Sequence, residues 1–247
     1  TPTMSEKMYE SLNSKLLPLG DGVIVCPSHG SGSVCGGKIR TREISTIGVE
    51  KKTKPMLQLS KEEFVRQKVA EKHQTPPYFK QMEIYNLNGP PILGNIPNPH
   101  PMTASEFSEH VDSCYIIDTR SPMSFGGAHI KGSYNLPPSR LSNAGWVVDY
   151  RKPILLVVED SQALTFAVHN LFRLGYDKIQ GYLIGGLEEW AKQGLPVSKV
   201  NLIGPHELRS MMQSNKNLVI LDVRREGEWN EGHIEGAKHI YLGHLEK

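Results

Sequence analysis

Three side chains near the start of the chain are of types that bind metal ions. Cys26, His29 and Cys35 have the spacing C-x2-H-x5-C, and thiolate and imidazole groups are the usual ligands of zinc. A structural zinc site needs four ligands, and this stretch lacks the fourth. Cys26 ends an apolar run and Cys114 precedes another, so both are predicted to be small buried side chains, whereas Cys35 lies among glycines and is predicted to be exposed.

The elements around these residues follow from local patterns. Met8, Leu12 and Leu16 recur at helical spacing, and residues 23–26 form a short β-branched run that predicts a strand closed by Pro27. A glycine- and serine-rich loop follows. Ser60 to Glu63 has the spacing of a capping box, which predicts a helix ending near residue 73, with a second short helix after Pro77.

A proline-rich stretch divides the chain. Residues 86–101 contain five prolines and two glycines, which suppress both helix and sheet. We therefore predict a first segment at 1–90 and a linker at 91–101.

The sequence after the linker is duplicated. Asp118, Arg120, His129 and Gly132 have counterparts at 222, 224, 233 and 236, so the offset is 104 residues at every position. A register kept across several spaced residues indicates a repeated domain. The first copy is predicted at 102–198, and residues 202–247 cover about the front half of a second copy.

The first copy alternates between strand and helix patterns. An apolar strand at 154–158 precedes a helix whose apolar face runs from Leu164 to Leu174, and a strand near 179–182 precedes a helix containing Trp190. This alternation predicts an α/β fold with a parallel sheet.

The spaced motifs resemble those of a known family. Asp118-Thr-Arg120, His129-Ile-Lys-Gly132, Gly185-Gly186 with Trp190, and Gly194-Leu-Pro196 resemble a rhodanese domain, and the second copy resembles the front half of another.

The first segment has a resemblance of its own. Residues 16–20, 23–33 and 45–48 look like the closing part of a metallo-β-lactamase αββα fold. Joined in this order, the pieces are similar to persulfide dioxygenase and rhodanese fusion proteins of sulfide metabolism.

The rhodanese resemblance implies a cysteine between a central strand and a helix, which accepts sulfur as a persulfide. Counting back from Gly175 places that position at Val158, which has no nucleophile, and the resemblance therefore implies no catalytic residue in the first copy. The two carboxylates that follow would repel an anionic sulfur donor. The alternative interpretation is structural, with Val158 as a buried strand end and Asp160 or Ser161 as a helix N-cap. The loop comprises Val158, Glu159, Asp160, Ser161, Gln162 and Ala163.

The metallo-β-lactamase resemblance implies a metal. His29 follows a strand where that fold places its last metal-facing group, so it is a candidate ligand of non-haem iron or zinc, or a side chain behind the ligands. The ten histidines include no H-x-H pair, so the main ligands implied by the resemblance are absent from this chain.

Composition limits the partners. Lys and Arg total 28 against 26 for Asp and Glu, with no long run of one sign and no apolar stretch of the roughly 20 residues that span a bilayer. We expect no nucleic-acid or membrane partner. A low-molecular-weight thiol persulfide is the implied substrate, a homo-oligomer is compatible with the sequence, and three cysteines fit a reducing, cytoplasmic location.

The sequence leaves three functions open. The leading hypothesis is part of a sulfide-metabolism fusion enzyme that combines persulfide dioxygenase and sulfurtransferase activities, with this chain alone inactive. The second is a non-catalytic rhodanese docking or regulatory module. The third is a metallo-β-lactamase-fold hydrolase, which would need a dinuclear metal centre. The rhodanese resemblance implies that Asp222, Arg224 and His233 hold strand ends and turns rather than catalyse.

Overall fold

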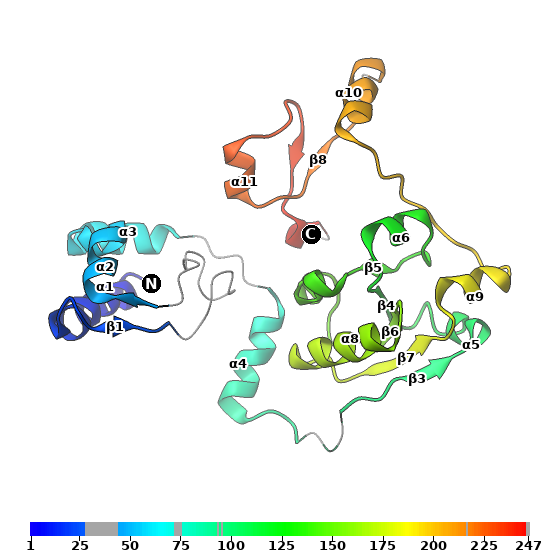
Figure 1. Cartoon of the computed structure of the whole chain (residues 1–247), viewed down its shortest axis with the longest axis horizontal. Helices are drawn as coiled ribbons and strands as arrows, with labels where there is room; N and C mark the ends of the chain where they lie inside the picture. The colour runs from blue at the N-terminus through cyan, green and yellow to red at the C-terminus, as the bar shows by residue number, and fades with distance from the viewer. Residues whose placement is uncertain (28–43, 72–75, 93, 95, 216, 246–247) are drawn as a thin grey trace. The chain divides into compact units, whose positions relative to one another are not determined.

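The computed structural model describes residues 1–27, 44–71, 76–92, 94, 96–215 and 217–245. The chain forms two compact units, at residues 1–74 and 75–247 (Figure 1). Among the described residues, no helix has both the length and the apolar character that crossing a membrane requires.

The first unit is mainly helical. Its elements are α1 (Pro2–Ser11), the π-helix η1 (Leu12–Leu16), η2 (Leu17–Leu19), β1 (Ile24–Val25), β2 (Ser45–Thr46), α2 (Ile47–Thr53), η3 (Pro55–Gln58) and α3 (Lys61–Ala70). Tyr9 of α1 meets Phe64 of α3 edge to face at 5.4 Å, and Phe64 is 2% exposed. The hydroxyl of Ser60 accepts a hydrogen bond from the amide of Glu63, so the predicted N-cap of α3 is confirmed.

The second unit contains a five-stranded sheet. Its elements up to residue 192 are α4 (Tyr78–Asn88), β3 (His100–Met102), α5 (Ala104–Ser108), β4 (Tyr115–Asp118), α6 (Pro122–Gly127), β5 (Tyr134–Asn135), η4 (Pro138–Asn143), α7 (Ala144–Val147), β6 (Ile154–Val157), α8 (Ser161–Arg173), β7 (Ile179–Leu183) and α9 (Gly186–Lys192). The strand order is β3-β7-β6-β4-β5, and every pair is parallel. The predicted α/β class with a parallel sheet is confirmed.

Two apolar layers cover the sheet, because neighbouring residues of a strand point to opposite faces. Ile154 and Leu156 of β6 contribute to the core beneath α8 and α7. Leu155 and Val157 face the other core, which includes residues of α5 and α9. All four side chains are at most 1% exposed, as expected for a central parallel strand with helices on both faces.

Strand β3 lies partly within residues 91–101, which the sequence predicted to be a linker without a strand. Its backbone pairs with β7, with Pro101 opposite Tyr182. Proline lacks an N–H donor and is therefore tolerated at the edge of a sheet. β3 is an edge strand, so a proline-rich sequence still completes the sheet.

Helix α4 belongs to the second unit, whereas the sequence placed residues 75–90 with the first segment. The reason is a close aromatic contact. Tyr78 is 7% exposed, and a Cβ added at Gly145 would lie 2.1 Å from a ring carbon of Tyr78. Only glycine at position 145 allows this approach of α4.

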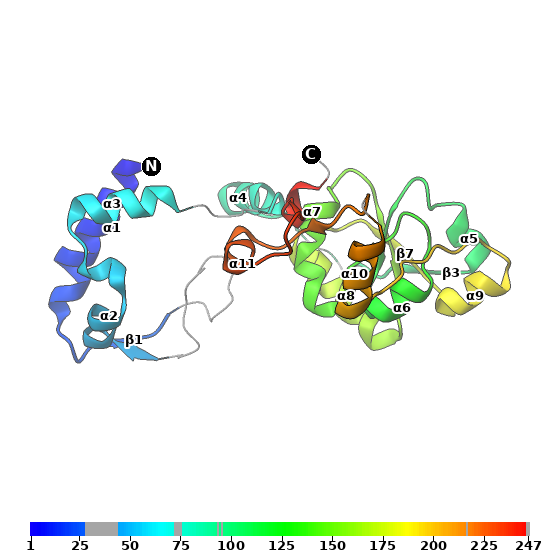
Figure 2. The same ribbon diagram turned by 90° about the horizontal axis from the view of Figure 1, so that it is seen from above.

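The second repeat is a smaller, more exposed body. It contains α10 (Pro205–Ser214), β8 (Leu221–Asp222), α11 (Glu226–Glu231), β9 (Lys238–His239) and η5 (Leu242–His244). β8 and β9 pair in parallel. Trp146 of α7 meets Tyr241 edge to face at 5.6 Å, and a Cβ at Gly243 would lie 2.4 Å from the Trp146 ring. Figure 2 shows α10 and α11 of this repeat in orange.

We expect residues 219–240 to exchange their amide hydrogens faster than residues 154–183. Val219 is 66% exposed and Leu221 is 44% exposed, whereas Leu155 and Leu156 of β6 are fully buried. Backbone hydrogen bonds with little apolar cover open at low free energy. Hydrogen exchange read by mass spectrometry tests this on the monomer. Equal protection of the two stretches would contradict it.

Candidate functional site

Val158 directly follows β6 at the carboxyl edge of the sheet. Its side chain is 8% exposed and lies in the same apolar cluster as Ala167 and Val168 of α8. A buried aliphatic group at this point contributes to the core and offers no atom for covalent chemistry.

The start of α8 is capped by a carboxylate. Asp160 is the N-cap, and its Oδ1 accepts a hydrogen bond from the amide of Ala163 at 2.8 Å. Asp160 was one of the two N-cap candidates from the sequence. The first turn of a helix favours an anion, and here the protein supplies that anion. Glu159 and Asp160 are exposed, so they face an incoming anion with negative charge.

A buried ion pair stabilises the end of the neighbouring strand β4. Asp118 is fully buried, and its carboxylate accepts hydrogen bonds from Nε and Nη2 of Arg120 and from the Arg120 amide. Nη2 of Arg120 also donates to the carbonyl of Ala128 at 2.8 Å. The pair therefore ties β4 to the end of α6.

Asn135 was missed by the sequence analysis. Its Nδ2 donates to the carbonyls of Asp118 and Arg120, at 3.1 and 2.9 Å. In the second repeat the position 104 residues later is His239, whose Nε2 lies 2.8 Å from the carbonyl of Arg224. Because a carbonyl only accepts, that nitrogen carries the hydrogen. The repeat offset was the signal that could have found both residues.

The second repeat reproduces the ion pair at its surface. Asp222 accepts hydrogen bonds from Nε and the amide of Arg224, and these bonds lower the pKa of Asp222 to about 2. His233 stacks on Trp229 at 3.5 Å, and its Nδ1 lies 3.0 Å from the Trp229 carbonyl. These contacts hold a strand end and a turn, as predicted.

Among the described cysteines, the one that belongs to the same unit as Val158 lies outside the Val158 loop. Cys114 is buried just before β4, with its Sγ 3.4 Å from Oε1 of Gln180, at the opposite edge of the sheet from Val158. Cys26 is exposed, so the prediction that it is buried is wrong. The reason is that β1 ends at Val25, before the cysteine. Cys35 lies outside the described residues.

The metal prediction concerns His29, which also lies outside the described residues. In the part of the chain that the structure describes, no three His, Cys, Asp or Glu side chains lie close enough to hold a metal ion. The described residues therefore do not supply the donor set of a non-haem iron or zinc centre.

Comparison with protein families identifies the domain that contains the five-stranded sheet. The model described as the rhodanese-like domain matches residues 103–193 and 204–247. An uncharacterized protein, slr1261 of Synechocystis sp., is 34% identical over 88 residues, which are 36% of this chain and 49% of that protein. YqhL of Bacillus subtilis, also uncharacterized, is 32% identical over 89 residues, which are 36% of this chain and 70% of that protein.

Among solved structures, the chain resembles a metallo-β-lactamase from Staphylococcus aureus. The two are 26% identical with a TM-score of 0.63, over 74% of this chain and 51% of that one. The chain thus spans about half the length of slr1261 and of this structure. Rhodanese-like sequence and a metallo-β-lactamase structural neighbour together support a fusion of these two types at the family level. The rhodanese-like model covers more than half of the chain, and the chain therefore belongs to the rhodanese-like domain family.

Proposed function

We propose that the chain is part of a sulfide-metabolism fusion enzyme that combines persulfide dioxygenase and sulfurtransferase activities, and that its first rhodanese repeat is catalytically inactive. The inactivity of the first repeat rests on the buried Val158 at the end of β6, and the fusion rests on the rhodanese-like match and the metallo-β-lactamase neighbour. Sulfur transfer by a rhodanese needs a thiolate there, and this repeat offers a methyl-bearing side chain instead.

The surroundings of Val158 support the same role. The Asp160 carboxylate occupies the helix start that would otherwise stabilise a sulfur anion. The buried pair of Asp118 and Arg120 is fully engaged in tying strand to helix. The first repeat then acts as a structural domain that packs against the second, with the ring of Trp146 in close contact with Gly243.

The substrate of the whole protein is a low-molecular-weight thiol persulfide, which would be oxidised by O2 at non-haem iron held by residues that include His29. Zinc in its place would fit the hydrolase alternative, because Zn²⁺ has no redox chemistry. The iron would supply oxygen activation. The metallo-β-lactamase neighbour supports this part of the proposal only at the level of fold. A cytoplasmic location and a homo-oligomer belong to the same proposal.

Oxygen uptake tests the proposed function. The complete protein to which this chain belongs is supplied with ferrous iron and glutathione persulfide, and we expect oxygen to be consumed in proportion to the iron bound. Hydrolysis of an ester or amide without oxygen uptake would favour a hydrolase. Neither reaction, together with retained binding of a protein partner, would favour a docking module.

A further inference from the structure

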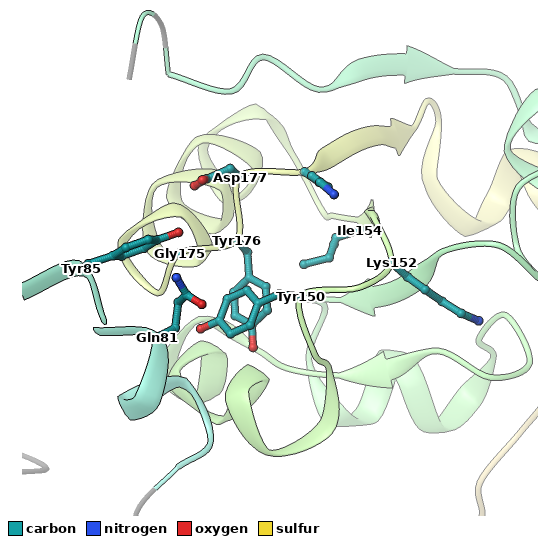
Figure 3. A pocket seen from close by; sticks show the side chains of 9 residues that line it. Gln81, Tyr85, Tyr150, Lys152, Ile154, Gly175, Tyr176 and Asp177 are labelled. Atoms are coloured by element: carbon teal, nitrogen blue, oxygen red, sulfur yellow. The ribbon is translucent and has the colours of Figure 1, made fainter. Parts of the chain in front are cut away.

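A cavity lies at the opposite edge of the sheet from Val158. It has a volume of about 150 Å³ and lies beside the amino ends of β6 and β7 (Figure 3). We call it the tyrosine pocket. The residues that line it include Gln81, Tyr85, Tyr150, Gly175, Tyr176 and Asp177. Strand β6 begins at the pocket, with Ile154, and ends just before Val158. The pocket and the Val158 loop therefore lie at opposite ends of this strand and are distinct sites.

Aromatic rings form the walls of the tyrosine pocket. Tyr150 stacks on Tyr176 with ring centroids 4.6 Å apart. A Cβ added at Gly175 would lie 3.3 Å from a ring carbon of Tyr85 and 3.5 Å from one of Tyr150. Gly175 also has φ +84°, which favours glycine. This glycine therefore lets the rings of Tyr85 and Tyr150 approach the same point.

The hydroxyl groups of the two stacked rings are already engaged. Tyr150 donates to the carbonyl of Leu174 at 2.8 Å, and Tyr176 donates to the carbonyl of Val148 at 2.9 Å. The rings are thereby fixed in place. Each ring covers one face of the other. A ligand can therefore interact only with ring surface outside the stack, and the π electrons of that surface attract cations.

Asp177 adds a carboxylate at the rim. Burial raises its pKa, and no neighbouring ammonium lowers it. The pKa of Tyr150 is raised to about 12, also chiefly by burial. These shifts disfavour negative charge in the free protein, and a bound cation would relieve them.

Two lysines also line the cavity, and neither neutralises Asp177. Lys152 points away from Tyr85 and Tyr150 (Figure 3). Its Nζ lies 3.4 Å from the carbonyl of Asp112 and 5.8 Å from the ring centroid of Tyr115. Lys178 is not among the causes that set the pKa of Asp177, which burial alone raises.

We propose that the tyrosine pocket binds a small methylated ammonium group, with the rings of Tyr85 and Tyr150 facing its methyl groups and Asp177 balancing its charge. Aromatic rings next to a carboxylate are the arrangement that recognises quaternary ammonium ions. The five heavy atoms of such a head group fit a cavity of about 150 Å³, since an engineered protein cavity of about that volume holds benzene, which has six heavy atoms. The amide of Gln81 supplies an acceptor for a polar tail.

Titration of the full chain with choline tests the proposal, with 3,3-dimethylbutan-1-ol as its uncharged analogue of the same shape. Nuclear magnetic resonance of the tyrosine rings provides the readout. We expect saturable choline binding with a dissociation constant of about 1 mM or tighter, and binding of the alcohol at least tenfold weaker. A peptide carrying trimethyl-lysine forms a second arm, and the tighter of the two ligands identifies the source of the head group.

Variants separate charge from shape. Tyr85→Phe keeps the ring and should bind choline within about threefold of the wild type, whereas Tyr85→Leu and Asp177→Asn should each weaken binding about tenfold. Lys152→Gln is the matched control and should leave binding unchanged. Both Tyr85 and Asp177 are reached by solvent, and unchanged circular dichroism confirms that the variants fold. Equal binding of the uncharged alcohol, unchanged binding by Asp177→Asn, or no saturation at about 10 mM would overturn the proposal.

Discussion

Replacing Asp118 with asparagine is expected to destabilise the first rhodanese repeat by about 3–5 kcal/mol. Asp118→Asn keeps the shape of the side chain but removes its charge. Arg120, whose side chain is only 11% exposed, would then be left buried beside an amide with no compensating carboxylate. Desolvation of an unpaired charge is the physical cause of the loss.

The repeat supplies a matched control for this variant. Asp222→Asn removes the equivalent carboxylate, but the side chain of Arg224 is 44% exposed and water replaces the lost partner. We expect no measurable change in stability. Urea unfolding can be followed by Trp190 fluorescence for the first repeat and by Trp229 fluorescence for the second, in each case with the other two tryptophans replaced by phenylalanine. Equal effects of the two asparagine variants would contradict the structural role given to Asp118.

A thiol introduced at the end of β6 is expected to react slowly unless the loop charges are also removed. Val158→Cys places a thiol next to Glu159 and Asp160, whose carboxylates disfavour the thiolate. Adding Glu159→Gln and Asp160→Ser should lower the pKa of the new thiol by about one unit, and so raise its reactivity near neutral pH by about tenfold. Serine at position 160 keeps the N-cap of α8.

The rate of alkylation by iodoacetamide measures this difference, in a background carrying Cys26→Ser and Cys35→Ser. Cys114 is 6% exposed and stays as an internal reference. For a matched control, Glu109→Gln and Asp112→Asn accompany Val158→Cys, because they remove the same charge just before β4, at the other edge of the sheet. A Val158→Cys thiol that already reacts at the rate of the triple variant would show that the loop carboxylates have no influence on it.

The sheet could be predicted from the sequence because its signals are local. The apolar run at 154–157 and the N-cap candidate Asp160 each depend on a few neighbouring positions. The fixed offset of 104 residues is visible by comparing the two copies in the sequence. The rhodanese resemblance also implied that Asp222, Arg224 and His233 hold strand ends and turns, and their hydrogen bonds are of this kind.

Features that depend on distant contacts could not be predicted. β3 exists because β7 offers it an edge, and nothing within a proline-rich stretch signals that partner. The tyrosine pocket likewise needs α4 to approach Gly145 and Gly175, which are about 60 and 90 residues away in sequence. Cys26 was misjudged because the length of β1 depends on its pairing with β2.

Thiocyanate formation from thiosulfate and cyanide by this chain tests most directly whether its first repeat is inactive. We expect no turnover above the background without protein, because Val158 cannot accept sulfur and Cys114 lies buried at the other edge of the sheet. A variant with serine at positions 26, 35 and 114 should behave identically. Turnover that a single Cys→Ser change at any of these positions abolishes would contradict the account, since it would show that another thiol serves as the sulfur acceptor.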